Sequence, residues 1–522
     1  MPEFEVLQDA DLAELERRLV DRLDLEEGSD SQPERSWYDT FDWRLHHAGL
    51  RLVAEPREGR LLLTCLPRPG VPPCGVFHLS VSDVPRFAWD LPASDLRRAI
   101  EGAVEMRALL PRAMVQCARK TFVQRNRDQK TIVRLVIDRP AVVGPHGPQA
   151  LSPRIIVVPL RGYAKAAKRA ARFVTRKLGL GKVQADELSR ASQALGVRIG
   201  GYVSKIDLTL DPAARADQAT KQICRRLVET MEANVDGMCL QVDSEFLHDF
   251  RVAVRRTRSA LSRIRGVFPA PTVRRFAREF RWLGQVTGPA RDYDVYLLQL
   301  DDLRQLVPEA MRPHLDPLRP WLEKKHVAAY HDLVAATRSP RFDKLLADWR
   351  TFLGAPVPKR SSLPNAQRPV LAVARTEIWR AYRRVLRDGK AIGPSSPNSD
   401  LHELRKTCKK LRYVLEFFRS LFPAGPMGEL IAALKSLQTN LGAIQDLEVQ
   451  ADSIAAMSEP LHRQESAATL MAIGVLVDQL HRRQAAEVAA FGAAFASFAA
   501  KGNQKLARKL FQSAKGADRR PA

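Results

Sequence analysis

The chain has 522 residues, 45% of them hydrophobic, which is more than one hydrophobic core usually serves, so a single small domain is excluded. The formal net charge of +24 is unevenly placed, because residues 1–210 hold 33 basic and 26 acidic residues while the remainder carries +17. A basic excess bears on partners rather than on fold, and this one fits nucleic acid, polyphosphate or an anionic membrane surface.

The first part of the chain, to about residue 205, mixes segments of alternating or apolar composition with segments of helical spacing. Strands are predicted over residues 3–7, 50–54, 60–66, 113–123, 131–137 and 154–160. Helices are predicted over residues 12–22, 93–108 and 164–178. Residues 1–205 are therefore expected to form an α+β domain with mainly antiparallel connections.

From about residue 212 the strand signal ends, and long helices separated by Pro and Gly clusters continue to about residue 500. Residues 212–500 are therefore predicted to form an all-α domain, with a Pro-rich linker at 354–369. Asp400 and Glu403 have the spacing of a capping box, which predicts that a helix starts there. The basic tail, residues 501–522, is expected to be disordered.

Cysteine usage and hydropathy set the expected compartment. The six cysteines include no C-x-x-C pair and no His at zinc-ligand spacing, which favours free thiols in a reducing compartment. The N-terminus has no pattern of a secretory signal, and the longest nearly uncharged apolar stretch, residues 488–500, is too short to span a bilayer. We expect a cytoplasmic protein that holds no metal and no cofactor.

The helical part contains the same pattern twice. Leu247-His-Asp-Phe-Arg-Val-Ala-Val-Arg-Arg-Thr-Arg258 is repeated as Leu401-His-Glu-Leu-Arg-Lys-Thr-Cys-Lys-Lys-Leu-Arg412, at an offset of 154 residues. The match continues without a gap, since Gly288, Asp292 and Val295 pair with Gly442, Asp446 and Val449. A whole helical unit has been duplicated, which predicts pseudo-two-fold packing with the two basic helices facing each other.

Each copy places its basic residues on one side of a helix. At 100° per residue the stripes consist of His248, Arg251, Arg255 and Arg258 in the first copy and His402, Arg405, Lys409 and Arg412 in the second. An apolar stripe lies beside each and fixes the direction of the basic one. Like charges four residues apart repel by a few tenths of a kcal/mol, which a bound anion would relieve. Both histidines are expected in the first turn, where free backbone N–H groups also favour anions.

Alternative interpretations are open for several of these residues. A basic run on a helix is usually a solvated face, and the duplication is what favours a binding role. Arg291 is assigned either to a helix-start ion pair with Asp292 or to the anion site. Four further cations, Arg256, Arg263, Lys406 and Lys410, point away from the stripes and are expected at the ordinary surface.

The segments 247–258, 288–295 and 401–413 resemble the CHAD family, the conserved histidine α-helical domains, with coverage of about residues 212–500. The resemblance implies two pseudo-symmetric four-helix bundles, a basic central pore and binding of inorganic polyphosphate. Carried over by position, the pore-lining residues would be His248, Arg251, Arg255, Arg258, Arg291, His402, Arg405, Lys409 and Arg412.

Residues 37–50 resemble, more weakly, the CYTH or triphosphate-tunnel family, which implies an antiparallel barrel with a tunnel. The active family needs an E-x-E-x-K strand, whereas this chain reads Glu3-Phe-Glu5-Val-Leu7 and lacks the lysine. The strand over 154–160, which should carry alternating carboxylates, has none. Because Mg²⁺ requires several hard oxygen ligands, this domain is predicted to have lost catalysis.

Three functions follow as hypotheses. The first is non-catalytic binding of inorganic polyphosphate, which would direct the protein to polyphosphate granules. The second is nucleic-acid binding, which the charge permits but which the lack of interleaved aromatic residues on the stripes disfavours. The third is triphosphatase activity, if the N-terminal domain is active. Other polyanions and an unidentified protein partner of the N-terminal domain are further expected partners.

Overall fold

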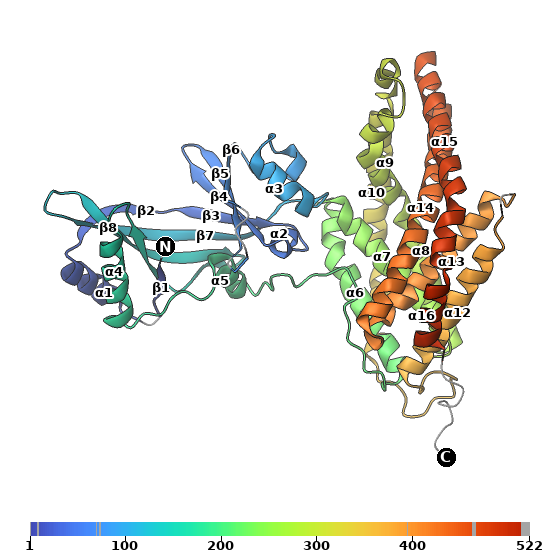
Figure 1. Ribbon diagram of the computed structural model, residues 1–522, viewed down its shortest axis with the longest axis horizontal. Coiled ribbons are helices and arrows are strands. Elements are labelled where there is room, and N and C mark those ends of the chain that lie inside the picture. The colour runs from blue at the N-terminus through green and yellow to red at the C-terminus, as the bar shows by residue number, and fades with distance from the viewer. Residues whose placement is uncertain are drawn as a thin grey trace. The chain divides into compact units, whose positions relative to one another are not determined.

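The computed structural model describes residues 2–7, 10–68, 70–71, 75–393, 395–461 and 466–512. It divides into two compact units, residues 1–203 and 204–522 (Figure 1). Residues 513–522 of the tail predicted to be disordered lie outside the described residues.

The first unit contains a ten-stranded antiparallel sheet with the strand order β1-β10-β8-β7-β3-β4-β5-β6, in which β2 also pairs with β7 and β9 with β8. The strands are β1 (Glu3–Glu5), β2 (Glu26–Ser31), β3 (Glu34–Asp39), β4 (Leu50–Arg57), β5 (Arg60–Pro67), β6 (Phe77–Val81), β7 (Leu110–Arg125), β8 (Thr131–Gly144), β9 (Gly147–Ala150) and β10 (Arg154–Pro159). All six predicted strands are confirmed. The other four strands, β2, β3, β6 and β9, were not predicted; the sequence of β2, EEGSDS, is polar and exposed throughout and has no alternation.

The helices of this unit cover the sheet on two sides. They are α1 (Leu12–Leu23), α2 (Arg44–His47), α3 (Asp95–Val104), α4 (Ala164–Arg176) and α5 (Glu187–Ala194), with a 3₁₀ turn η1 (Ala88–Asp90). Leu19 of α1 and Val174 of α4 share one core cluster with Ile155 of β10. Leu188 of α5 packs in a different cluster with Trp37 of β3. The expectation of an α+β unit with antiparallel connections is confirmed.

The second unit is helical, as expected. Its helices are α6 (Ala216–Cys239), α7 (Ser244–Arg263), α8 (Ala270–Val286), α9 (Gly288–Arg304), α10 (Leu318–Thr337), α11 (Pro340–Gly354), α12 (Val370–Lys390), α13 (Asn398–Phe417), α14 (Ala424–Leu461), α15 (Ala467–Phe498) and α16 (Lys501–Phe511), with 3₁₀ turns η2 (Glu309–Leu315) and η3 (Arg419–Leu421). In the described parts of the chain, none of the helices offers an apolar run that could span a lipid bilayer.

The duplication is visible in the helix boundaries and in the hydrogen bonds between the copies. α7 and α13 begin and end at positions 154 residues apart, and so do the starts of α6 and α12. Ala216 N donates to Arg368 O at 2.9 Å, and Val370 N donates to Ala214 O at 2.8 Å. When each residue is replaced by its equivalent in the other copy, 154 positions away, each of these bonds becomes the other. A two-fold axis passing between the two bonds requires this relation. The predicted pseudo-symmetry is therefore built into the hydrogen bonding.

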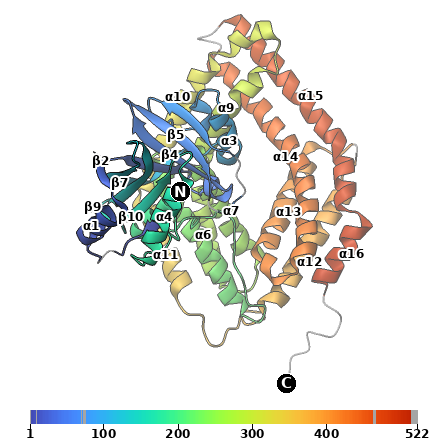
Figure 2. The same ribbon diagram turned by 60° about the vertical axis from the view of Figure 1, so that its left-hand side comes forward.

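The two copies differ in one helix. In the first copy α8 and α9 are separate helices that meet at Thr287, with Pro289 at the start of α9. Proline lacks the N–H that would continue the hydrogen-bond ladder. In the second copy the equivalent residues belong to the single helix α14. Figure 2 shows α14 and α15 extending to one end of the unit, where they share an apolar cluster with α9 and α10.

Three expectations about the helices need correction. Asp400 does not cap α13, because the helix already starts at Asn398 after Pro397. His248 and His402 are each the fifth residue of their helix, beyond the four N–H groups without an intrahelical acceptor. Residues 501–511 are not disordered but form α16, because Leu510 and Phe511 are buried and Phe511 contacts Phe422 with ring centroids 5.1 Å apart.

Candidate functional site

A cavity of about 750 Å³ lies between the two copies of the repeat. Its walls come from α7, α9, α10, α13 and α14. Six of the nine residues predicted to line a pore are in these walls: His248, Arg251, Arg255, Arg291, Arg405 and Lys409. The two basic stripes therefore meet at one cavity, to which both copies contribute cations.

Local contacts hold three of the guanidinium groups in place. Arg251 Nη1 donates to Gly284 O and to Thr287 Oγ1, both at 3.0 Å. Arg291 Nη1 donates to Ser244 O at 3.2 Å, so it joins α9 to the start of α7. Arg405, the equivalent of Arg251, pairs with Asp446 at 2.8 Å. Of the two positions expected for Arg291, the structure places it in the cavity lining, with its hydrogen bond to Ser244 O.

The cavity has an excess of positive charge. Its lining holds four arginines and one lysine but only two carboxylates, Asp292 and Asp446. Burial, with Arg405 and Arg255 nearby, lowers the pKa of Lys409 to about 8. Burial also lowers the pKa of Arg251 to about 10, opposed by Asp292. Burial is the larger cause of both shifts, and the neighbouring cations add to it, so a bound anion would be favoured by both groups.

Three predicted residues lie outside the cavity lining: Arg258, His402 and Arg412. Arg412 pairs with Glu416 at 2.7 Å, one turn further along α13. The pKa of Arg258 is lowered by burial and by Arg281, which does not line the cavity. His402 is half-buried, and its Nδ1 has no hydrogen-bond partner. The stripe from His248 to Arg258 is about 15 Å long, so it extends past the space that the cavity provides.

Several lining residues were not predicted. Asp292 and Asp446 belong to the duplicated pattern, and their equivalence across the two copies was the signal that could have found them. Tyr293, Tyr296 and Trp321 also line the cavity, although the stripes themselves carry no aromatic residue. All three rings pack against the apolar cluster at this end of the unit, so long-range packing rather than local pattern brings them here.

Arg256 does not lie at the ordinary surface, contrary to expectation. It is 8% exposed, donates to Ser204 O at 2.9 Å and pairs with Glu416 of α13 at 2.8 Å. Because Arg412 pairs with the same carboxylate, Glu416 links α7 to α13 beside the cavity. This contact fixes the spacing of the two helices that carry the basic stripes.

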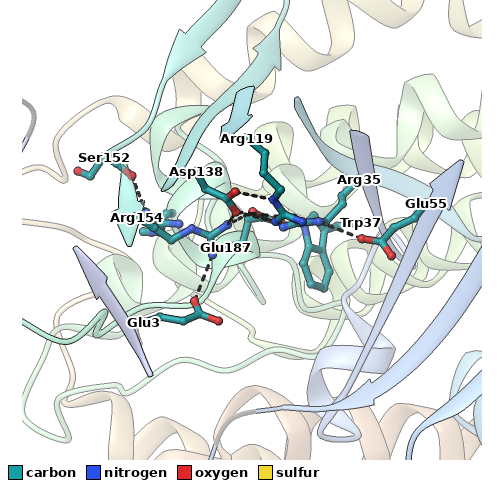
Figure 3. Close-up of polar contacts among 10 residues, drawn as sticks. Glu3, Arg35, Trp37, Glu55, Arg119, Asp138, Ser152, Arg154 and Glu187 are labelled. Carbon is teal, nitrogen blue, oxygen red and sulfur yellow. Dashed lines mark hydrogen bonds and ion pairs between the residues drawn. The ribbon is translucent and has the colours of Figure 1, made fainter. Parts of the chain in front are cut away.

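The interior of the first unit holds a second set of charges. Figure 3 shows the guanidinium groups of Arg35 and Arg154 directed at Glu187, which α5 brings to the sheet. Arg35 Nη1 donates to both carboxylate oxygens of Glu187 at 2.8 and 2.9 Å, and Arg154 Nη2 donates at 2.6 Å. Trp37 Nε1 completes the set at 3.3 Å. Arg154 also donates to Glu3 at 3.3 Å.

A second buried carboxylate lies in the same network. Asp138 of β8 is fully buried and accepts two hydrogen bonds from Arg119, at 2.6 and 2.7 Å. Burial alone would raise the pKa of Asp138, but Arg119, Arg154 and Arg35 outweigh it and lower the pKa below its usual value. The interior carboxylates thus come from β8 and α5, not from the strand over 154–160. Each is bound by arginines that would repel a metal cation.

This geometry defines a class of protein, namely a duplicated helical unit with a cationic cavity between its two copies. Residues 222–455 match the family model described as CHAD domain, so the helical unit contains a CHAD domain.

Relatives and solved structures are similar to parts of the chain. The uncharacterized proteins Rv2226 and MT2285 of Mycobacterium tuberculosis are each 26% identical over 296 residues, covering 54% of this chain and 53% of the relative. The chain thus spans about half the length of the curated relatives it matches. The CHAD domain of the plant Ricinus communis is 26% identical with a TM-score of 0.47, covering 55% of this chain and 94% of that one. PptA from Streptomyces chartreusis is 17% identical with a TM-score of 0.43, covering 54% and 99%.

Proposed function

We propose that the helical unit binds inorganic polyphosphate in the cavity between its two copies and does not cleave it. The observation that carries this proposal is the convergence of Arg251, Arg255, Arg405 and Lys409 from α7 and α13 on one cavity. CHAD domains are linked in general to polyphosphate, and the match over residues 222–455 supports the same ligand here.

The energetics favour a ligand with many phosphate groups. Arginine binds phosphate oxygens through a planar fork, and each charge-assisted contact contributes about 1.5–3 kcal/mol when partly desolvated. The cations of the cavity lower one another's pKa, so an anion gains both the direct contacts and the relief of this repulsion. A ligand bearing one phosphate would reach only part of the set.

Nucleic acid is a second candidate for the cavity, because Tyr293, Tyr296 and Trp321 are aromatic. Their rings, however, pack against the apolar cluster, and the Tyr296 hydroxyl donates to Val449 O at 3.4 Å. These rings lie at the apolar end of the cavity, whereas the basic stripes carry no interleaved aromatic residue, which favours the inorganic polymer. Labelled polyphosphate should stay bound to the cavity when RNA is added at the same phosphate concentration; its displacement would favour nucleic acid.

Binding should depend on pH through Lys409. A polyanion favours the charged ammonium, so its pKa rises on binding and a proton is taken up. Affinity is then greatest below the free-state pKa of about 8 and declines as pH rises through it. We expect about tenfold weaker binding at pH 9 than at pH 7 from this group. Calorimetry in two buffers of different ionisation enthalpy measures the proton uptake.

The matched variant for this prediction is Lys409→Arg, which keeps the positive charge but does not titrate in this range. It should bind with nearly constant affinity from pH 7 to pH 9. A wild-type affinity that is equally flat would show that Lys409 does not contact the ligand.

We further propose that the first unit is not a triphosphatase. Its interior carboxylates, Asp138 and Glu187, are each held by arginines at 2.6–2.8 Å, which supports this proposal because a divalent cation needs several free oxygen ligands. Tripolyphosphate incubated with the full chain and Mg²⁺ or Mn²⁺ should release no phosphate above the rate without protein. Release that is lost in Glu187→Gln would instead assign catalysis to this network.

Polyphosphate binding would direct the protein to polyphosphate granules in the cytoplasm. Fluorescently tagged protein should form foci in cells that accumulate granules and should be diffuse in cells that cannot make polyphosphate. The same foci in both cell types would argue for a different anchor.

A further inference from the structure

More basic residues line a groove elsewhere in the helical unit than line the cavity. A groove of about 720 Å³ runs along α12 and is closed by the ends of α7 and α16. A second hollow of about 350 Å³ continues it, because Trp379, Arg383 and Arg387 belong to the walls of both. We call the two together the arginine groove. Its basic lining residues are Arg263, Arg265, Arg380, Arg383, Arg384, Arg387, Lys390 and Arg508.

Few acidic groups neutralise this charge. Glu377 pairs with Arg380 at 2.5 Å, and Asp388 pairs with Arg384 and Arg387 at 3.3 and 2.9 Å. Among the described residues, no ion pair is recorded for Arg263, Arg265 or Arg383. Arg263 Nε is buried without a hydrogen-bond partner, and burial together with Arg265 lowers the pKa of Arg263. The groove therefore has unused donors.

The duplication shows that the fold does not require these arginines. α6 is the equivalent of α12 at the offset of 154, and there the positions of Arg383, Arg384, Arg387 and Lys390 are held by Glu229, Thr230, Ala233 and Asp236. α6 has Arg225 and Arg226 at the positions of Trp379 and Arg380 but lacks the other four charges, and it packs within its own copy without them. These four charges of α12 are thus specific to the second copy, which a structural role common to both copies does not explain.

The lining is not purely ionic. Trp379 is half-buried in the wall shared by the two hollows and stacks on Tyr382, with ring centroids 6.0 Å apart and planes 18° apart. Single-stranded nucleic acids are bound by arginine-rich grooves that also offer an aromatic face, because every base can stack. Inorganic polyphosphate has no group that could use such a face.

We propose that the arginine groove binds single-stranded nucleic acid, with phosphates on the arginines of α12 and a base on Trp379. The groove is separate from the cavity, since no residue lines both. Regular spacing of cations along α12, from Arg380 to Lys390, covers about 15 Å of helix and suits an extended strand rather than a compact anion. This inference does not depend on what the cavity binds.

The test uses the full chain and a fluorescently labelled 12-nucleotide single strand, with affinity measured by anisotropy at several salt concentrations. Arg383→Ala combined with Arg387→Ala should weaken binding about tenfold or more and reduce the salt dependence by about two phosphate contacts. Trp379→Leu, which keeps apolar volume but removes stacking, should weaken it about fivefold or more.

The matched control is Arg127→Ala with Arg274→Ala, which removes the same charge from exposed positions elsewhere. This control should bind the strand as the wild type does. Unchanged affinity of the Arg383/Arg387 variant would overturn the proposal. The proposal would also be overturned by two results together: wild-type affinity of the Trp379→Leu variant, and full displacement of the strand by inorganic polyphosphate. The groove would then accept any polyanion.

Discussion

Replacing Arg251 and Arg405 together by alanine is expected to weaken polyphosphate binding about 100-fold or more. The two arginines occupy equivalent positions on α7 and α13 and line the cavity from opposite copies. Each contributes a charge-assisted contact of about 1.5 kcal/mol or more, and about 1.4 kcal/mol corresponds to a factor of ten. Titration with labelled polyphosphate of defined length measures the loss.

The control for this variant comes from the same two helices. Arg258→Ala with Arg412→Ala removes the same charge from equivalent positions that lie outside the cavity lining. We expect this pair to cost much less affinity. If the two double variants weaken binding equally, the ligand follows the total charge of the helices and not the cavity. Wild-type affinity of the Arg251/Arg405 variant would end the proposal that the cavity is the site.

Replacing Glu187 by alanine is expected to destabilise the first unit by about 3–5 kcal/mol, because Arg35 and Arg154 would be left buried without their main partner. The Glu187 side chain is 4% exposed, and that of Arg154 is 6% exposed. Asp138 lies 4.0 Å from Arg35 and 3.6 Å from Arg154, so it compensates only in part. Hydrogen exchange should become faster in β3 and β10.

Because the two units are separate, the same measurement supplies an internal reference. Peptides from α7 and α13 in the second unit should exchange as in the wild type. Glu187→Gln, which keeps the shape and two hydrogen-bonding atoms, should cost less than Glu187→Ala. If exchange in β3 and β10 does not change in either variant, the network contributes nothing to stability and its arginines are free for another ligand.

Buried charges are balanced differently in the interior of the first unit and in the cationic cavity of the second. In the first unit Arg35, Arg119 and Arg154 each pair with a carboxylate of the same chain, whereas in the cavity five cations share two carboxylates. Charges that are already paired have little to gain from an external anion. The cations of the cavity, which outnumber their carboxylates, are therefore the ones expected to bind an anion. The same reasoning applies to the arginine groove.

Much of the architecture could be predicted from the sequence. Alternation over the predicted strands and helical spacing after residue 212 are local patterns, and each element found in this way is present. β2 and α5 were missed because a polar strand and a short helix have weak local signals. The helical tail was missed because Leu510 and Phe511 gain their burial from other helices, including contact with Phe422.

The sequence by itself determined that a helical unit is duplicated at an offset of 154 and that each copy has a basic stripe, because repeat and helical period are both properties of spacing along the chain. Only the tertiary structure decided which cations of the stripe share the cavity, that Arg256 crosses to Glu416, and that Arg263, Arg265 and Arg508 lie beside the arginines of α12. These facts depend on which side chains are neighbours in space. A charge acts over a few ångströms, and the residues within that range come from helices far apart in sequence.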